Sequence, residues 1–355
     1  MIYKAIISVV LAKSILDPGN PEAVSYLLAL IEEIVTNYNL DGLHLDYIRY
    51  PFQNLGAKPI YGYGFESRVE FWEQTNVDPA ALAVEDPLWQ EWTGFRTEQI
   101  TEFVGKASRM IKKLKPQLTI SAAVFPYPRW ERVARIQQDW EQWIEEGYID
   151  WLVPMTYAEN TAQLATMVEP LVEKQGKAHE TLIVPAVQLK PGQGLSNLDQ
   201  IEMIREFSFQ GYALFAANGF SADLQQILSQ TQGDQPLVLP HRQPLTAAAM
   251  KFATLGQEWS FYWGTKEAQA LAPALKADWQ QRSDRVEQQL KALAANPSMK
   301  NLIFTKIELQ SLQEQFNQWP LPEELYQRSI WGHHLQEIAQ LLAMYEQNLD
   351  RDYFR

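Results

Sequence analysis

Four apolar runs recur along the first part of the chain at nearly constant spacing. They begin at residues 118, 149, 181 and 211, so the steps between them are 31, 32 and 30 residues. Evenly spaced strand–helix units of this length are typical of βαβ repeats, whose strands pair in parallel. The spacing therefore predicts an α/β fold with a parallel sheet that the common hand of the crossovers curls one way. The four predicted strands are Leu118–Phe125, Ile149–Tyr157, Thr181–Leu189 and Gly211–Ala217.

The segments around these runs extend the pattern. An Asn-Pro pair begins a helical pattern over residues 20–38, and residues 40–47 follow as a short predicted strand. The apolar residues 2–11 predict another buried strand, and a short signal peptide is the alternative for the same run. The connection over residues 51–116 is much longer than the others and holds several Trp residues. Insertions of this size follow strands at the functional face of a barrel.

The pattern changes near residues 231–244, where Pro, Gly and Gln replace the periodic apolar residues. Beyond this point, runs of apolar residues step by threes and fours, which predicts two or three long helices. We therefore predict two domains, a βα-barrel domain over residues 1–232 and a helical hairpin or small bundle over residues 245–355. Self-association through these C-terminal helices is a further hypothesis.

Composition excludes several classes of partner. The net charge is −13, and residues 1–240 carry most of it, with 30 acidic and 18 basic side chains. A surface with this much negative charge repels phosphate backbones. We therefore expect no nucleic-acid partner. No apolar run approaches the roughly 18 residues of a membrane span. The absence of cysteine excludes disulfides and thiolate sites, and no metal or cofactor motif is present, so we predict neither a metal nor a cofactor.

The stretch DGLHLDYIRYP at residues 41–51 holds the clearest candidate for chemistry. On a barrel strand, alternate side chains face the helices and the interior, so the two leucines assign His44 and Asp46 to the interior. Asp46 falls near the carboxyl end of its strand, where barrel enzymes keep their catalytic groups. Arg49 is a candidate partner that would keep Asp46 ionised. A purely structural Asp–Arg pair explains the same spacing equally well.

Together with its neighbours, this stretch resembles the bacterial glycosyl-hydrolase-like family ten, and its cyanobacterial members in particular. The resemblance spans roughly residues 14–230 and rests on LDPGNPEAVSYLLALIEEIVTNYNLDGLHLDYIRYP, LTISAAVFPYPR, IDWLVPMTYA and GYALFAA. It implies a (β/α)8-type (TIM) barrel that acts on O-glycosidic bonds of polysaccharide. It also implies a catalytic role for Asp46 and a position in the substrate-binding site for Arg49 and Tyr157. Family members have further βα units before the Asp-Pro-Gly motif, so we expect this barrel to be incomplete at its N-terminus.

Glycosidases usually need a second carboxyl, and two glutamates are candidates. Glu159 follows one predicted strand and Glu131 follows another, although a solvated loop charge explains each of them more simply. Aromatic residues near the strand ends and in the insertion are candidates for stacking on sugar rings, although on helices such residues more often belong to the core. The candidates for substrate binding, in addition to His44 and those already named, are Tyr47, Trp72, Tyr127 and Trp130, with Trp89 and Trp92 beside them in the insertion.

Two functions are compatible with these features. The first is a glycoside hydrolase acting on a bacterial cell-wall or extracellular polysaccharide, with Asp46 as nucleophile or base and a glutamate as acid. The alternative is a catalytically inactive carbohydrate-binding or scaffold protein built on a degenerate barrel. The chain as written predicts a cytoplasmic protein, and a truncated N-terminus would leave an exported or periplasmic location open.

Overall fold

The computed structural model describes residues 16–54, 61–177, 181–190, 194–231, 238–265, 273–318 and 326–353 of the 355-residue chain. The chain divides into two compact units, the first comprising residues 1–157 and 181–186 and the second residues 158–180 and 187–355. This division differs from the predicted domain boundary near residues 231–244, so that boundary stays a prediction. The predicted strand at residues 2–11 lies outside the described residues.

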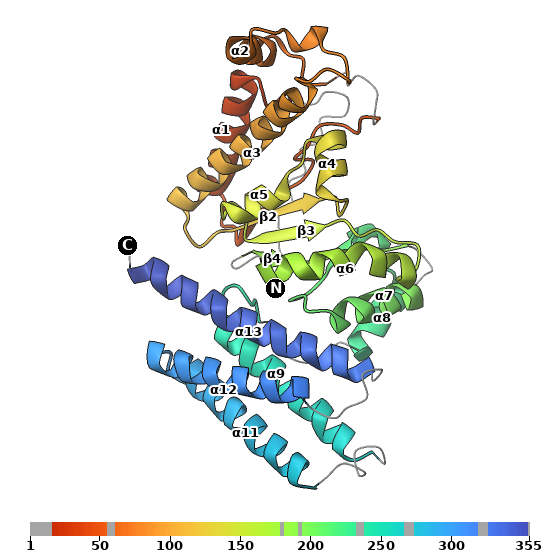
Figure 1. Ribbon diagram of the computed structural model, residues 1–355, viewed down its shortest axis with the longest axis vertical. Coiled ribbons are helices and arrows are strands. Elements are labelled where there is room, and N and C mark those ends of the chain that lie inside the picture. Colours follow the sequence, from red (N-terminus) through yellow and green to blue (C-terminus); the bar gives the residue numbers. More distant parts are fainter. Residues whose placement is uncertain are drawn as a thin grey trace. The chain divides into compact units, whose positions relative to one another are not determined.

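The first unit is a parallel sheet with helices (Figure 1). Its four strands pair in the order β1-β2-β3-β4, and every pair is parallel. The predicted α/β class and parallel sheet are therefore confirmed. The elements are α1 (Pro21–Asn37), β1 (Gly42–Leu45), α2 (Phe65–Thr75), the 3-10 turn η1 (Pro79–Ala81), α3 (Trp89–Leu114), β2 (Thr119–Val124), α4 (Arg129–Ile136), α5 (Trp140–Glu145), β3 (Trp151–Pro154) and β4 (Leu182–Ile183).

A closed barrel is not shown. Among the described residues, the strands form two separate sheets, the four-stranded one and a pair of strands, β5 (Ala186–Gln188) with β6 (Ala213–Phe215). The predicted strand over residues 181–189 is divided between β4 and β5. Pro185 lies between them, and a proline has no N–H to donate to a neighbouring strand, so the ladder is interrupted there.

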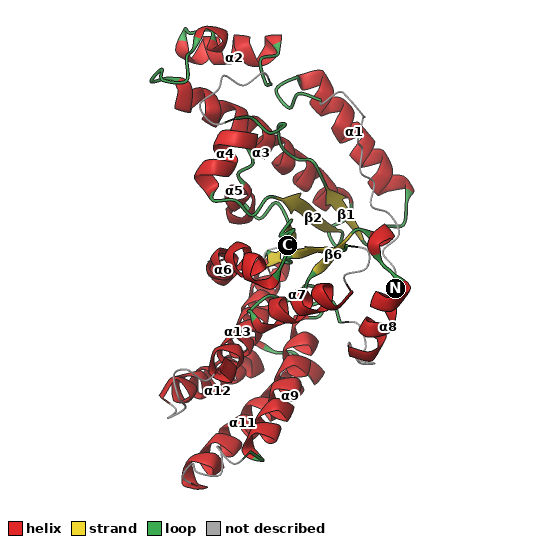
Figure 2. Cartoon of the chain, turned by 90° about the vertical axis from the view of Figure 1, so that its right-hand side faces the viewer, coloured by secondary structure: helices red, strands yellow, loops and turns green. Residues whose placement is uncertain are grey.

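The start of α1 shows how the Asp-Pro-Gly-Asn-Pro stretch folds. The Asn20 side chain accepts hydrogen bonds from the backbone N–H groups of Glu22 and Ala23, at 2.9 and 3.0 Å, and thereby caps the helix. Asp17 accepts a hydrogen bond from the N–H of Gly19 at 3.0 Å and another from the Tyr50 hydroxyl at 2.8 Å. The entry to α1 is thus tied to the loop that follows β1. Figure 2 shows α1 and α3 near β1 and β2.

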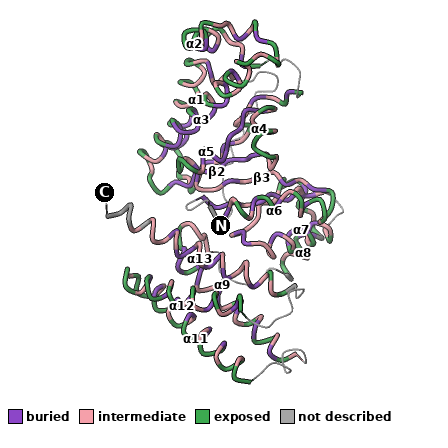
Figure 3. The backbone as a smooth tube through the Cα atoms, viewed as in Figure 1, coloured by how far each residue is buried: buried purple, intermediate pink, exposed green. Residues whose placement is uncertain are grey.

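In the sequence, residues 132–146 have the pattern of one helix between two predicted strands, but they belong to two helices, α4 and α5. Gln137 ends α4 in the left-handed conformation, with φ of 49°. Its side chain accepts a hydrogen bond from Gln53 at 2.8 Å, which holds the break against the loop after β1. The interior of the unit lies along the sheet, where Figure 3 draws much of β2 as buried; the side chains of Ile120, Ala122 and Val124 are fully buried.

The second unit is mostly helical. Its described elements besides the β5–β6 pair are α6 (Thr161–Lys177), α7 (Gly194–Glu206), the 3-10 turn η2 (Ala217–Gly219), α8 (Ala222–Thr231), α9 (Pro244–Trp263), α11 (Pro273–Ala295), α12 (Met299–Gln318) and α13 (Tyr326–Tyr353). The sequence predicts two or three long C-terminal helices, and the described residues hold four. No described helix combines the length and the apolar character needed to cross a membrane.

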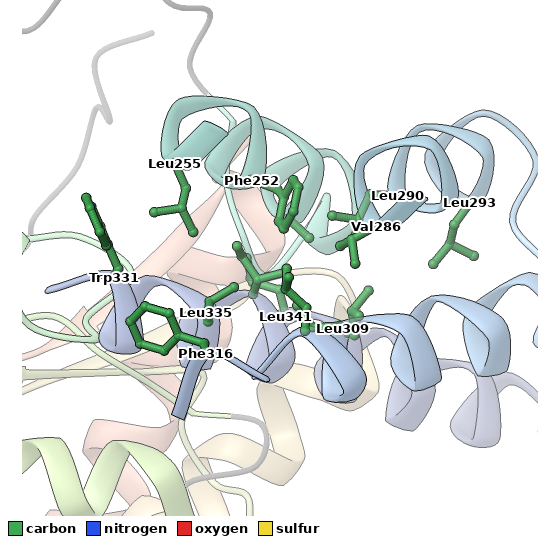
Figure 4. Close-up of a cluster of buried hydrophobic side chains, with 14 of the residues drawn as sticks. Phe252, Leu255, Val286, Leu290, Leu293, Leu309, Phe316, Trp331, Leu335 and Leu341 are labelled. Carbon is green, nitrogen blue, oxygen red and sulfur yellow. The ribbon is translucent and has the colours of Figure 1, made fainter. Parts of the chain in front are cut away.

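The four C-terminal helices enclose one apolar core. Figure 4 shows side chains from all four meeting there, among them Phe252, Val286, Leu309 and Leu341. Helix α13 also contacts the end of α7, because His333 Nδ1 hydrogen-bonds the carbonyl oxygen of Glu206 at 2.7 Å. The C-terminal helices are therefore packed against the βα segment that precedes them within this unit.

Candidate functional site

The candidate site lies where the strands of the first unit end. Leu45 of β1 is in register with Ala122 of β2, and Val124 of β2 is in register with Pro154 of β3. Because the strands are parallel, Asp46 and Tyr157 leave the sheet at the same edge. The carboxyl ends of parallel strands are where barrel and open-sheet enzymes place their reactive groups.

Asp46 is held by the residue that follows it. The backbone N–H of Tyr47 donates a hydrogen bond to Asp46 Oδ1 at 2.7 Å, and Tyr47 adopts a left-handed conformation with φ of 57°. Such a conformation is uncommon for a bulky residue and often marks a functional position. Burial raises the pKa of Tyr157 to about 12, and the negative charge of Asp46 adds to the rise. The Tyr157 phenol near Asp46 therefore stays protonated at neutral pH.

His44 belongs to the support of the site. Its Nδ1 shares a hydrogen bond with the hydroxyl of Ser121 on β2, at 2.8 Å. Burial lowers the pKa of His44, and the nearby charge of Asp46 opposes that shift only in part. The imidazole is thus neutral at pH 7 and joins two strands, and its predicted role in substrate binding stays a prediction.

Arg49 makes no direct ion pair with Asp46, although the charge of Asp46 partly offsets the burial that lowers the pKa of Arg49. Its guanidinium donates to the carbonyl oxygen of Tyr50 at 3.1 Å, and no ion pair joins it to Asp46. It lies instead among three rings, with its central carbon 5.1 Å from the ring centres of Tyr47 and Phe52 and 5.2 Å from that of Phe125. We call Tyr47, Phe52 and Phe125 the aromatic cage. Cation–π attraction to three rings outweighs one exposed ion pair, which contributes little in water.

The loop after β1 is joined to the α4–α5 break by hydrogen bonds that no pattern in the sequence indicates. Gln138 is buried, and its amide accepts from the N–H of Phe125 at 2.9 Å and donates to the carbonyl oxygen of Ile48 at 3.1 Å. The backbone N–H of Tyr50 donates to the carbonyl oxygen of Ile136 at 3.0 Å. The residues on either side of Arg49 are therefore both fixed.

Arg132 stabilises the loop after β2, which carries Phe125 and Tyr127. It is fully buried, forms an ion pair with Glu141, and donates to the carbonyl oxygen of Tyr127 at 2.7 Å. Its guanidinium also lies 4.3 Å from the ring centre of Trp140. Burial lowers the pKa of Arg132 to about 10, so the guanidinium stays charged at pH 7. Nothing in the stretch RWERVARIQQDW, residues 129–140, distinguishes the buried Arg132 from an exposed arginine.

The predicted sugar-stacking residues do not form one surface. Tyr127 stacks on Phe125 at a ring distance of 5.4 Å and so adjoins the aromatic cage. Trp130 on α4 and Trp72 on α2 are exposed, by 67% and 51%, and neither makes a ring contact with the cage. Trp92 is fully buried beside Phe71, which corrects its assignment to a sugar-binding cleft. Trp89 packs partly buried against the same cluster.

Both candidates for the second carboxyl are already paired. Glu131 forms an ion pair at 3.0 Å with Arg135, one turn along α4. Glu159 forms an ion pair at 2.6 Å with Lys190, and its own side chain is 76% exposed. These environments favour solvated, structural charges over a perturbed catalytic acid. Within the described ranges, no group of three or more His, Asp or Glu side chains is arranged to hold a metal ion.

Comparison with known proteins places these features in a family. The sequence profile of the family described as "glycosyl hydrolase-like 10" matches residues 3–205. Over 156 residues, 39% of this chain and 27% of the relative, the sequence is 26% identical to the glycosyl hydrolase YngK of Bacillus subtilis. Over 164 residues, 40% of this chain and 31% of the relative, it is 24% identical to the glycosyl hydrolase DigH of Escherichia coli. The matched part thus spans less than a third of each relative.

A solved structure is similar in fold over part of the chain. The glycoside hydrolase domain of PgaB (BpsB) from Bordetella bronchiseptica superposes with a TM-score of 0.50 at 13% identity, covering 66% of this chain and 69% of that domain. At this identity the likeness concerns the fold alone. The family profile covers more than half of the chain and includes the strand that leads to Asp46. The chain therefore belongs to the glycosyl hydrolase-like 10 family.

Proposed function

We propose that the protein is a glycoside hydrolase that cleaves O-glycosidic bonds of a bacterial cell-wall or extracellular polysaccharide, on a (β/α)8-type barrel. The observation that carries the proposal is Asp46, a carboxylate at the carboxyl end of a parallel strand, near the protonated Tyr157. Family membership and the likeness to a glycoside hydrolase domain support it. In this proposal Asp46 is the nucleophile or the base.

The proton for the leaving group comes from a second carboxylic acid in most glycosidases. Glu131 and Glu159 remain the proposed candidates. Each would have to leave its present partner, Arg135 or Lys190, to reach a glycosidic oxygen. Tyr157 is proposed to donate a hydrogen bond to a sugar hydroxyl or to Asp46, since its raised pKa keeps its proton in place.

The test is the release of reducing ends from peptidoglycan and from bacterial exopolysaccharides. Asp46→Asn should lower kcat by about a thousandfold, within the range for loss of a catalytic acid or base. Asp41→Asn is the matched control, because Asp41 is exposed at the opposite end of the same strand. Turnover that survives in Asp46→Asn would contradict the proposal.

The second candidate function is a carbohydrate-binding protein without turnover. The pairing of both glutamates in ion pairs favours it, together with the exposure of Tyr47 and Phe52 beside Arg49. Binding of polysaccharide by wild type and Asp46→Asn alike, without release of reducing ends, would support this function.

Self-association through the C-terminal helices stays a separate hypothesis, which light scattering on the intact chain and on a chain ending at residue 240 would test.

A further inference from the structure

Arg49 lies in the loop that follows Asp46, close enough for the charge of Asp46 to act on it, and it contacts more rings than any other described arginine of the first unit. Arg68, Arg129 and Arg132 each meet a carboxylate directly. Among the described residues, Arg49 meets no carboxylate in an ion pair, and its one side-chain hydrogen bond goes to the neutral carbonyl oxygen of Tyr50. A guanidinium carries five N–H donors, so most of those on Arg49 are not used within the protein.

The aromatic cage determines which part of the guanidinium is left for a ligand. Attraction between a ring and the charge of a guanidinium uses none of its N–H groups, which are left for other partners. The Phe52 and Phe125 rings are themselves fixed edge to face, 4.8 Å apart at 86°. None of the Arg49 nitrogens is among the buried side-chain atoms that lack a partner, so its remaining donors reach solvent.

The backbone of Arg49 is held as firmly as its side chain. The residue before it is bound through its carbonyl oxygen to Gln138, and the residue after it through its N–H to Ile136. The N–H of Arg49 itself donates to the carbonyl oxygen of Tyr47 at 2.8 Å. A cation that is fixed in this way loses little conformational freedom on binding, which is what a recognition residue requires.

The rings also make an anion more favourable at this position. Burial lowers the pKa of Arg49, although the charge of Asp46 opposes the shift. Water therefore solvates the Arg49 guanidinium only in part, and an anion beside it can neutralise its charge. A planar carboxylate matches the donor fork of a guanidinium in a two-point contact, which a neutral hydroxyl does not.

We propose that Arg49 binds a carboxylate on a sugar beside the bond that is cleaved, so that the substrate is an acidic glycan. This inference rests on the proposed glycosidase function. The net charge of −13 repels a polyanion at long range, but such repulsion is screened beyond about 10 Å at 0.1 M salt, whereas a direct contact is not. Arg49 therefore determines which sugar of the glycan lies beside the cleaved bond, because the glycan binds with one of its carboxylates on Arg49.

The experiment compares one glycan in two forms. Fragments of a uronic-acid-containing bacterial exopolysaccharide are used as prepared and after reduction of their carboxylates to primary alcohols. Wild type should cleave the acidic form with a KM about ten to a hundred times lower, the range for a hydrogen bond to a charged group. Arg49→Met retains a side chain that packs in the cage and should raise the KM for the acidic form to that of the reduced form. Arg49→Lys should restore only part of the difference, because an ammonium makes no two-point contact.

Arg109→Met is the matched control, because Arg109 also lies over a ring, 5.5 Å from the centre of Tyr148, on α3. It should keep the preference for the acidic form. Thermal unfolding of each variant separates loss of binding from loss of fold. Equal KM values of wild type for the two forms would overturn the inference and leave the glycosidase function standing. Binding of the acidic form that depends on Arg49, without cleavage of either form, would support the role of Arg49 and reject the glycosidase function.

Discussion

Replacing Gln138 with alanine should loosen both loops that frame the candidate site. The Gln138 side chain joins the N–H of Phe125 to the carbonyl oxygen of Ile48, at 2.9 and 3.1 Å, and the residue is only 1% exposed. Alanine removes both hydrogen bonds and leaves two backbone groups without their partner. One loop carries Arg49 and the other carries Phe125 of the aromatic cage, so the same change should displace the cage.

The expected loss of stability follows from the burial of the two backbone groups that lose their hydrogen-bond partner. A buried donor or acceptor that loses its partner costs about 1–3 kcal/mol. Because Phe125 and Ile48 are only partly buried, water compensates each group in part, and the lower end applies. We therefore expect the free energy of unfolding to fall by about 2 kcal/mol in total. For a unit of this size, that change lowers Tm by about 4–8 °C.

Denaturant unfolding followed by tryptophan fluorescence measures this loss, and the KM for polysaccharide reports the displaced cage. Gln142→Ala is the control, because the Gln142 amide donates only to Glu98, at 3.4 Å on the surface. A loss in Gln138→Ala within about 0.5 kcal/mol of that control, the usual range for surface substitutions, would refute the assigned role.

Three further predictions concern the core, the opposite end of the sheet, and the helical unit. Trp92→Ala should lower the free energy of unfolding by about 3–5 kcal/mol, whereas Trp72→Ala, at an exposed position, should change it by about 0.5 kcal/mol or less, as denaturant unfolding would show. Asp150→Asn weakens contacts to Lys112 at 2.8 Å and to the N–H of Ile120 at 2.7 Å, so it should cost about 1–2 kcal/mol and leave kcat unchanged, since this end of the sheet lies away from Asp46. Burial raises the pKa of Glu337 from 4.5 to about 7, despite Lys251 at 2.8 Å, so the folded state binds more protons than the unfolded state between these values. Stability should therefore fall by on the order of 3 kcal/mol as the pH rises from below 4.5 to above 7, and Glu337→Gln should remove that slope, measured by unfolding at pH 4, pH 5 and pH 8.

Features of the fold that depend on local sequence were predictable. The apolar runs mark β2 and β3 because buried parallel strands need continuous apolar residues, and the Asn-Pro pair marks the start of α1 because it satisfies the helix N-terminus locally. The division of 132–146 into two helices was not predictable. It depends on Gln137 and Gln138, whose amides bind loops distant in sequence, and a glutamine in a helical pattern carries no sign of such a partner.

The site was predictable in its position and less so in its contacts. The alternation in DGLHLDYIRYP places Asp46 at the strand end because the period of a strand is fixed. The contacts of Arg49 were not predictable because three rings from two loops meet only in the folded chain. For the same reason Trp92 and Trp72, in one insertion, are equivalent in sequence but lie in the core and at the surface respectively.

The order of the strands has a consequence for how the chain assembles. Neighbouring residues of β2 and β3 are 30 positions apart, whereas His44 and Ser121, paired between β1 and β2, are 77 positions apart. Closing the longer loop costs only about 0.8 kcal/mol more, because the entropy of closure grows with the logarithm of length. The β2–β3 pair is thus favoured to form first, and the strand that brings Asp46 joins it later. Lengthening the segment between β1 and β2 would preserve this order at little further cost, because doubling the loop adds only about 0.6 kcal/mol.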